Sequence, residues 1–216
     1  MLKTKDETYS GDKYIIDQGW SKYTDQDHET WRTLYQRQRK LLPGRACDEF
    51  IEGIDALAIG AEGIPDFKEI NARLAQTTGW EVVAVPGLIP DAPFFELLSR
   101  KKFPAGNFIR KPDQLDYIQE PDVFHDVFGH VPLLTNQFYA DHLEAYGHGG
   151  LRAQNFGTVK NLARLYWYTI EFGLMNTPQG LRIYGAGIVS SPGETIFALE
   201  DNSPHRIAFD IMRMMQ

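Results

Sequence analysis

Apolar residues return at helical intervals along most of this chain, and this periodicity restricts its fold more than any other feature. Residues 24–42 open with Thr24 and Asp27 at the spacing of a helix-capping box, and apolar side chains then recur every three or four positions. The first strand-like run, residues 80–85, is short and rich in valine. These patterns predict a mainly α (α+β) fold in which a small antiparallel sheet accompanies the helices.

The same signals predict the remaining elements. Helices are expected at residues 47–60, 64–79, 136–150 and 158–174, and a short one is expected after the proline-rich loop that opens residues 86–101. Residues 181–200 hold short β-prone runs broken by glycine and by a Ser-Ser-Pro-Gly sequence. Residues 1–23 are expected to form an irregular arm, and residues 24–216 a single domain.

The composition argues against several functional classes. A formal net charge of −7 makes nucleic acid an unexpected partner, because phosphate binding needs a clustered basic surface. No apolar run approaches the length of a transmembrane helix or a signal peptide, so we expect a cytoplasmic protein. The lone cysteine, Cys47, has no intramolecular disulfide partner and is expected to be a buried structural thiol.

Two histidines, His125 and His130, lie five residues apart in the mostly apolar stretch PDVFHDVFGHVP. Residues at this spacing point about 140° apart on a regular α-helix, whereas residues four apart share a face. If both bind one metal ion, the backbone between them must depart from the α-helix. Gly129 would permit a bend, and Pro132 biases the residue before it away from helical geometry.

A third ligand is suggested by Glu171, the single acid within the predicted helix at 161–174. Its neighbours at helical spacing are apolar or aromatic, and a carboxylate there is costly unless it is paired or bound to a metal. Two histidines and one carboxylate form the set that binds non-haem Fe(II), although catalytic zinc uses it too. The alternative is that both histidines are structural and that Glu171 pairs with Arg164, and the spacing leaves both interpretations open.

Three motifs together resemble the pterin-dependent aromatic amino acid hydroxylases, and most closely their short bacterial members that act on phenylalanine. The motifs are EPDVFHDVFGHVPLL at 120–134, LYWYTIEFGL at 165–174 and YGAGIVSSPGE at 184–194, in the order found in that family. With VPGLIPDAPFFELL at 85–98 and NFIRKPDQLDYIQEPD at 107–122, the resemblance extends over roughly residues 24–210.

This resemblance implies an Fe(II)- and tetrahydropterin-dependent monooxygenase of phenylalanine catabolism, which hydroxylates L-phenylalanine to L-tyrosine with O₂. The implied metal ligands are His125, His130 and Glu171. Tetrahydrobiopterin, or a related tetrahydropterin, would contact Gly87, Leu88, Ile89, Phe94, Asp126 and Tyr166. The substrate pocket would comprise Arg110, Tyr117, Pro121, Trp167, Gly187 and Ser190, and the guanidinium of Arg110 would bind the substrate carboxylate. Beyond the metal centre, no side chain is implied as a catalyst.

Several of these roles have simpler alternatives. For Arg110 the alternative is a surface arginine, for Asp126 a helix-surface acid, and for Phe94 a core side chain, with the adjacent Phe95 as the second candidate ring. Aromatic residues at helical spacing, such as Trp167, are also typical of core packing. Because histidine must be neutral to bind iron, metal affinity is expected to fall below about pH 6.

The chain departs from the family in two respects. Ile118 stands where many animal members have threonine, which removes a hydroxyl from the substrate region. The chain also ends with residues 205–216, earlier than the catalytic domain of that family usually does. Residues 24–216 are therefore expected to be a catalytic domain that is short at its C-terminus and works as a monomer. Two alternatives stay open: a tryptophan or tyrosine hydroxylase on the same scaffold, and a catalytically weak pterin- or metal-binding homologue.

Overall fold

The computed structural model describes residues 10–215, so the first nine residues of the expected N-terminal arm lie outside the described part. Its α-helices are α1 (Asp25–Leu41), α2 (Asp48–Ala56), α3 (Phe67–Leu74), α4 (Asp91–Ser99), α5 (Gln137–Phe156), α6 (Val159–Tyr166), α7 (Ala186–Val189), α8 (Pro192–Glu200) and α9 (Ile211–Met215). The strands are β1 (Glu81–Val85), β2 (Lys102–Gly106), β3 (Leu174–Thr177) and β4 (Gly180–Ile183). Short 3₁₀ turns are η2 (Gly11–Tyr14), η3 (Trp20–Lys22), η4 (Pro112–Gln114) and η6 (Val131–Thr135), and two π-helical segments are η5 (Phe124–His130) and η7 (Trp167–Glu171).

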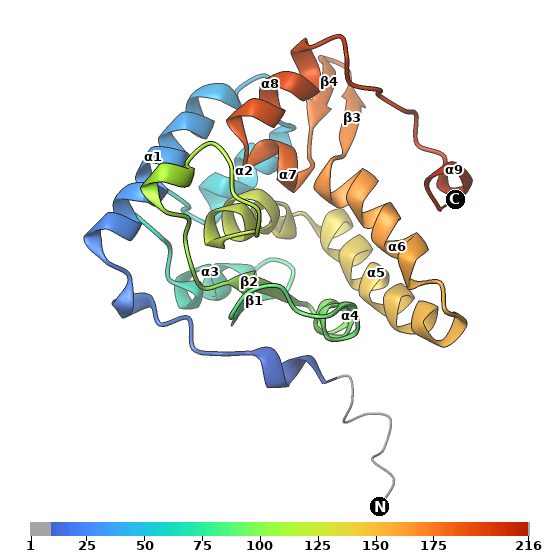
Figure 1. The fold of residues 1–216 in the computed structure, drawn as a ribbon, viewed down its shortest axis with the longest axis horizontal. Coiled ribbons are helices and arrows are strands. Elements are labelled where there is room, and N and C mark those ends of the chain that lie inside the picture. The colour runs from blue at the N-terminus through green and yellow to red at the C-terminus, as the bar shows by residue number, and fades with distance from the viewer. Residues whose placement is uncertain (1–9, 216) are drawn as a thin grey trace, which may run out of the picture.

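The mainly helical α+β fold expected from the sequence is confirmed. Helices surround the central segment η5, with α1 and α2 on one side and α5 and α6 running side by side on the other (Figure 1). Helix α4 packs along α5, α2 packs on η6, and both α7 and β2 contact η5. The π-helical segment η5 therefore lies in the interior, where neighbouring elements fix its position.

An aromatic cluster anchors η5 to the core. The rings of Phe124 and Phe128 stack with centroids 4.8 Å apart, and Phe124 also meets Trp31 of α1 edge-on at 5.1 Å. Phe50 of α2 meets Phe128 at 5.8 Å. All four side chains are fully buried, which stabilises each by about 1.5–3 kcal/mol relative to exposure. The segment that carries both histidines is thus held by its own apolar residues.

The sheets differ in part from the expectation. Strands β3 and β4 form the antiparallel pair, but β1 and β2 form a second, parallel pair in which Glu81 lies opposite Lys102 and Val85 opposite Gly106. Helix α4 connects the two parallel strands, as such a crossover requires. The sequence did not indicate β2, because Pro104 at its centre is unfavourable in a strand.

Two regions of the chain contain more helix than the sequence predicted. Residues 181–200 have β-prone runs, but after β4 they fold into α7 and α8, and α8 begins with Ser191 as the cap and a proline at its first turn. Helix α5 continues past the glycines at which it was expected to end. A Cβ on Gly147 would lie 2.3 Å from the backbone nitrogen of Ser99, so this glycine allows α5 to pack closely against the end of α4.

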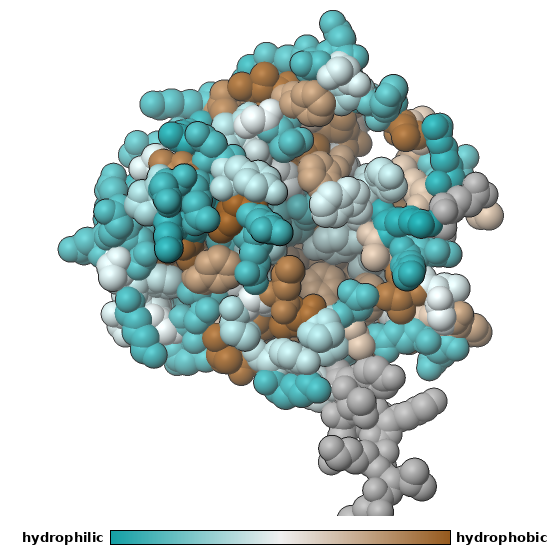
Figure 2. All heavy atoms as spheres, in the orientation of Figure 1, coloured by the Kyte–Doolittle hydropathy of each residue, from teal (hydrophilic) through white to brown (hydrophobic). Residues whose placement is uncertain are grey.

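Hydrophilic side chains cover much of the outer part of the face drawn in Figure 2, whereas apolar side chains are visible toward its centre. Within the described residues, no helix has both the length and the hydropathy that crossing a membrane requires.

Candidate metal centre

His125 and His130 both lie on the π-helical segment η5. Because π-helical hydrogen bonds join residues five apart, this geometry brings the two histidines onto one face, which an α-helix would not do. The sequence predicted a departure from the α-helix near Gly129, and the structure has the departure along the whole segment. Gly129 instead allows close packing, since a Cβ there would lie 2.9 Å from the carbonyl oxygen of Ala186.

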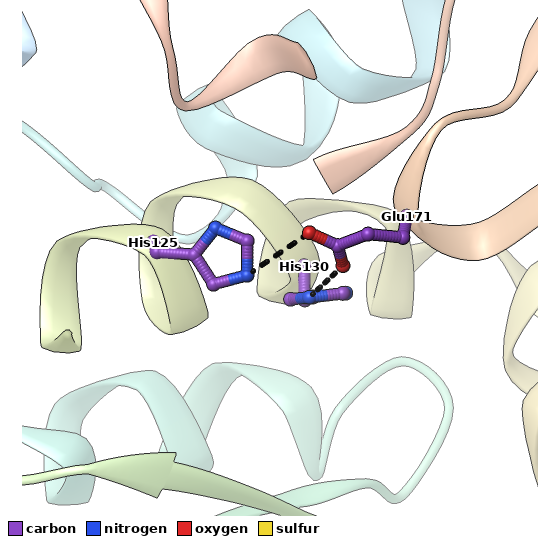
Figure 3. A group of neighbouring side chains, drawn as sticks. All are labelled: His125, His130 and Glu171. Carbon is purple, nitrogen blue, oxygen red and sulfur yellow. Dashed lines mark ion pairs between the residues drawn. The ribbon is translucent and has the colours of Figure 1, made fainter. Parts of the chain in front are cut away.

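Glu171 ends the second π-helical segment, η7, and its carboxylate meets both histidines (Figure 3). Its Oε1 lies 3.5 Å from Nε2 of His125 and its Oε2 lies 3.3 Å from Nε2 of His130. One potential ligand atom from each of the three residues lies within 4.8 Å of the others. Ligands bound to one ion at about 2.0–2.2 Å lie slightly closer, so small side-chain movements suffice to complete the site.

Space for this carboxylate depends on Gly187. A Cβ at position 187 would lie 2.5 Å from Oε1 of Glu171, a distance that real Cβ atoms do not show. Gly187, which the resemblance assigned to the substrate pocket, therefore borders the metal centre directly.

The electrostatics of the three residues favour a divalent cation. Burial lowers the pKa of His125 to about 4 although Glu171 opposes the shift, so this imidazole is neutral and free to bind a metal. Burial also opposes ionisation of Glu171, yet its hydrogen bond with His130 and the nearby His125 lower its pKa overall. The contribution of His125 to the loss of metal affinity is accordingly expected near pH 4 rather than pH 6.

Ser190 contacts the ring nitrogen of His125 that does not face Glu171. Its hydroxyl lies 3.0 Å from Nδ1 of His125 and the residue is buried. A hydrogen bond at Nδ1 fixes the ring orientation and leaves Nε2 toward Glu171. Ser190, expected in the substrate pocket, thus contacts a candidate ligand.

Arg110 is buried, which rules out the alternative of a surface arginine. Asp122, which is fully buried, accepts hydrogen bonds from Nε of Arg110 at 2.8 Å and from its Nη2 at 2.9 Å. It also accepts from the backbone N–H groups of Arg110 and His125. The sequence pattern did not single out Asp122, which directly follows Pro121. It joins the candidate substrate clamp to the segment that carries the histidines.

The residues expected along the pterin come from four segments: Gly87, Leu88 and Ile89 follow β1, Phe94 lies on α4, Asp126 on η5 and Tyr166 at the end of α6. Phe95 is buried in the core, whereas Phe94 is only half-buried and meets Tyr166 edge-on with ring centroids 5.7 Å apart. The ring of Tyr166 lies 6.0 Å from that of His130. The structure therefore distinguishes Phe94 from Phe95, and brings Phe94 into a chain of rings that reaches the metal centre.

The loop that holds Gly87, Leu88 and Ile89 has one contact that the sequence did not indicate. The backbone N–H of Leu88 donates to Oε1 of Glu120 at 3.3 Å, and Glu120 precedes Pro121 of the candidate substrate segment. The side chain of Leu88 is 74% exposed.

The remaining candidate substrate residues are accessible. Trp167 is 56% exposed and packs on Phe172 at a centroid distance of 4.7 Å, so it is not the plain core residue of the alternative interpretation. Tyr117 is 77% exposed and Pro121 is half-buried. The candidate ligands His125 and Glu171 are themselves not fully buried, with 16% and 12% of their side chains exposed.

Asp126 faces inward rather than lying on the helix surface. Its Oδ2 accepts a hydrogen bond from the N–H of Gly106 at 2.7 Å, at the end of β2. Burial raises the pKa of Asp126 to about 7, against the lowering effect of that hydrogen bond. Its carboxyl is therefore protonated in the folded protein over a pH range in which it is ionised in the unfolded chain.

This difference predicts a pH-dependent effect of Asp126→Asn on the metal-free protein. Because the folded pKa is raised from 3.8 to about 7, the wild-type protein loses stability as the pH rises through this interval. The neutral asparagine does not. The gain in free energy of unfolding on substitution should be larger at pH 8 than at pH 5 by about 2–3 kcal/mol. Urea unfolding at the two pH values measures it, and an equal difference at both would contradict the assignment.

This chain is similar to known proteins over most of its length. The family model for biopterin-dependent aromatic amino acid hydroxylases matches residues 14–216. A phenylalanine-4-hydroxylase of Caulobacter vibrioides is 64% identical over 203 residues, which cover 94% of this chain and 69% of that protein. That of Chromobacterium violaceum is 57% identical over 96% of this chain and 70% of its own length.

Solved structures give the same result. A crystal structure of Chromobacterium violaceum phenylalanine hydroxylase with bound iron(III) and 7,8-dihydrobiopterin has a TM-score of 0.91 and 59% identity, over 94% of this chain and 74% of that one. A structure of the same enzyme with iron and phenylalanine has a TM-score of 0.90 and 56% identity, over 94% and 73% of the two chains.

Proposed function

Because this chain belongs to the biopterin-dependent aromatic amino acid hydroxylases, we propose that it is a phenylalanine 4-monooxygenase, which converts L-phenylalanine and O₂ to L-tyrosine with Fe(II) and a tetrahydropterin. The observation that carries the proposal is the meeting of His125, His130 and Glu171 at one point, from two separate π-helical segments. Relatives named for this activity, and their structures with iron, phenylalanine and dihydrobiopterin, support it.

The donor set fits Fe(II). Two imidazole nitrogens and one carboxylate bind three positions of a divalent ion and leave the others open, which is the arrangement of non-haem iron oxygenases. When bound, the iron and the tetrahydropterin supply the electrons that activate O₂. The part of the protein is to hold these groups and the substrate in register and to keep water away from the reacting atoms.

The proposed pterin site lies between the loop at 87–89 and the ring of Phe94. A flat aromatic face is suited to stacking on a pterin, and Phe94 is exposed enough to offer one. Tyr166 connects it to the metal ligand His130, and burial raises the pKa of Tyr166, which keeps its phenol neutral. Asp126, close to His125 in sequence and directed at Gly106, completes the proposed set.

The proposed substrate site uses Nη1 of Arg110, the guanidinium nitrogen to which Asp122 does not bind. Asp122 occupies Nε and Nη2, whereas Nη1 makes only a long contact of 3.4 Å with the carbonyl of Leu115. Nη1 can therefore donate to the substrate carboxylate while the buried ion pair keeps the guanidinium in place. The remaining contacts are proposed from Tyr117, Pro121, Trp167, Gly187 and Ser190, and Trp167 offers an exposed face to the aromatic ring.

The experiment is a comparison of amino acid substrates. The iron-loaded protein with tetrahydrobiopterin should form tyrosine from phenylalanine faster than it hydroxylates tryptophan or tyrosine, by chromatography of the products. A preference for tryptophan or tyrosine would reassign the substrate. Iron binding without any hydroxylated product would favour a metal-binding homologue instead.

Three further proposals concern the context of the enzyme. We propose that residues 24–216 act as the catalytic domain, that the protein works as a cytoplasmic monomer, and that nucleic acid is not a partner. The family match over residues 14–216 supports the first, and the net charge of −7 supports the absence of nucleic acid as a partner. Sedimentation equilibrium tests the monomeric state.

A further inference from the structure

The carbonyl groups around Ser190 are held by two buried polar side chains from other elements. Gln38 of α1 is fully buried and donates from Nε2 to the carbonyl oxygen of Val189. The same Nε2 lies 3.3 Å from Oγ1 of Thr195, which is also fully buried. The residue immediately before Ser190 is thereby tied to a helix about 150 positions earlier in the chain.

Thr195 completes the arrangement from α8. Its Oγ1 lies 2.8 Å from the carbonyl oxygen of Ile188 and 2.8 Å from that of Ser191. Together, Gln38 and Thr195 engage the carbonyl groups of the two residues before Ser190 and of the one after it. The backbone at Ser190 is therefore constrained on both sides by interactions that do not involve the metal ligands.

Stability alone does not account for a glutamine here. Oε1 of Gln38 is buried and has no hydrogen-bond partner among residues 10–215, and an unsatisfied buried acceptor of this kind is destabilising. An apolar side chain of similar length would avoid that cost. The amide cannot be rotated to remedy it, because Oε1 would then face the carbonyl oxygen of Val189.

We propose that Gln38 and Thr195 are positioning residues for the metal centre. They hold the backbone of residues 188–191 so that the hydroxyl of Ser190 meets Nδ1 of His125 at 3.0 Å. With Nδ1 engaged, Nε2 of His125 points toward Glu171, where a metal ion would bind. The inference rests on the ligand set of the proposed function.

The test measures Co(II) affinity and the visible Co(II) absorption spectrum, which report ligand geometry without requiring activity. A crystal structure of a Chromobacterium relative contains bound cobalt. Ser190→Ala should weaken Co(II) binding about 10- to 100-fold, the range for partners of metal ligands. Gln38→Met and Thr195→Val, which preserve side-chain volume but remove the hydrogen bonds, should each weaken it by about 10-fold and shift the absorption bands.

Three comparisons separate positioning from general stability. Thr195→Ser keeps the hydroxyl and should restore affinity to within about twofold of wild type. Thr30→Val is the matched control, because Thr30 is a buried residue of the same helix α1 whose hydroxyl donates to the carbonyl of Gln26, remote from residues 188–191. It should bind Co(II) as wild type does. Gln38→Met combined with Ser190→Ala should be no weaker than Ser190→Ala alone, since both act through one hydroxyl.

Wild-type affinity and spectrum in both Gln38→Met and Thr195→Val would overturn the inference, as would additive losses in the double variant. If Gln38→Met does not fold, the comparison of Thr195→Val with Thr195→Ser decides the matter. Failure of the proposed function is distinguishable, because the wild-type protein itself would then bind Co(II) no better than Glu171→Ala.

Discussion

Replacing Glu171 by alanine is expected to lower both Fe(II) affinity and the rate of tyrosine formation by more than about 100-fold, the upper end of the effect of losing an outer partner of a metal ligand. The substitution removes the only carboxylate among the three candidate donors in the described residues. Of the three donors grouped among the described residues, it leaves the two histidines on one π-helical segment and removes the donor that comes from the second. Equilibrium dialysis against Fe(II) and a product assay measure the two effects.

Glu69→Ala provides the control, because Glu69 is an exposed glutamate on α3 and does not belong to the group of candidate metal ligands. It should leave iron affinity and activity unchanged. Glu171→Gln keeps the shape of the side chain and removes its charge, so it should bind Fe(II) more weakly than wild type but retain its fold. Equal product from wild type and Glu171→Ala would show that the iron site has been assigned to the wrong residues.

Local signals in the sequence predicted local structure well. Thr24 and Asp27, chosen for their spacing alone, form both hydrogen bonds of the capping box at the start of α1. The position of each bond depends on residues three apart, and such contacts are fully specified by the chain itself. The cap of α3 is equally local, because the side chain of Asp66 accepts from the N–H of Lys68, two residues further on.

The metal centre could be predicted in part. The histidine spacing showed that an α-helix could not bring both rings to one ion. The apolar surroundings of Glu171 suggested it as the third ligand, and the resemblance to the hydroxylases favoured that role over a pairing with Arg164. The spacing did not show that the solution is a π-helix, because the hydrogen-bond register of η5 is set by its packing. Phe124 and Phe128 stack on one another and on α1 and α2, and Gly129 packs against α7. These contacts join segments far apart in the sequence, and no periodicity reports them.

The sequence is a poor guide where one residue type suits two different structural roles. Asp122 directly follows Pro121, a pair that is common in the first turn of a helix, where an acid is favourable without any side-chain partner. In the structure its carboxylate is fully buried and forms an ion pair with the guanidinium of Arg110. In residues 186–200 a helix was not predicted, although Ser191 and Pro192 are good helix-start signals. The β-prone residues around them favoured strands instead.

Replacing Asp122 by alanine is therefore expected to destabilise the protein by about 3–5 kcal/mol, because it leaves the guanidinium of Arg110 buried without its counter-charge. Two backbone N–H groups, those of Arg110 and His125, lose their acceptor as well. The same change should raise the KM for phenylalanine more than it lowers kcat, since Arg110 is no longer held where it can bind the substrate carboxylate.

The matched control for Asp122→Ala is Asp116→Ala, which removes the partner of a different arginine in an exposed ion pair. The Oδ1 of Asp116 lies 2.8 Å from Nη1 of Arg37, and its side chain is 90% exposed. Breaking such a pair costs at most about 1 kcal/mol, so this variant should unfold close to wild type. Urea unfolding and steady-state kinetics of both variants measure the difference. Two results would contradict these assignments. Equal stability of Asp122→Ala and Asp116→Ala would contradict a stabilising role of the buried pair between Asp122 and Arg110, and an unchanged KM would contradict binding of the substrate carboxylate by Arg110.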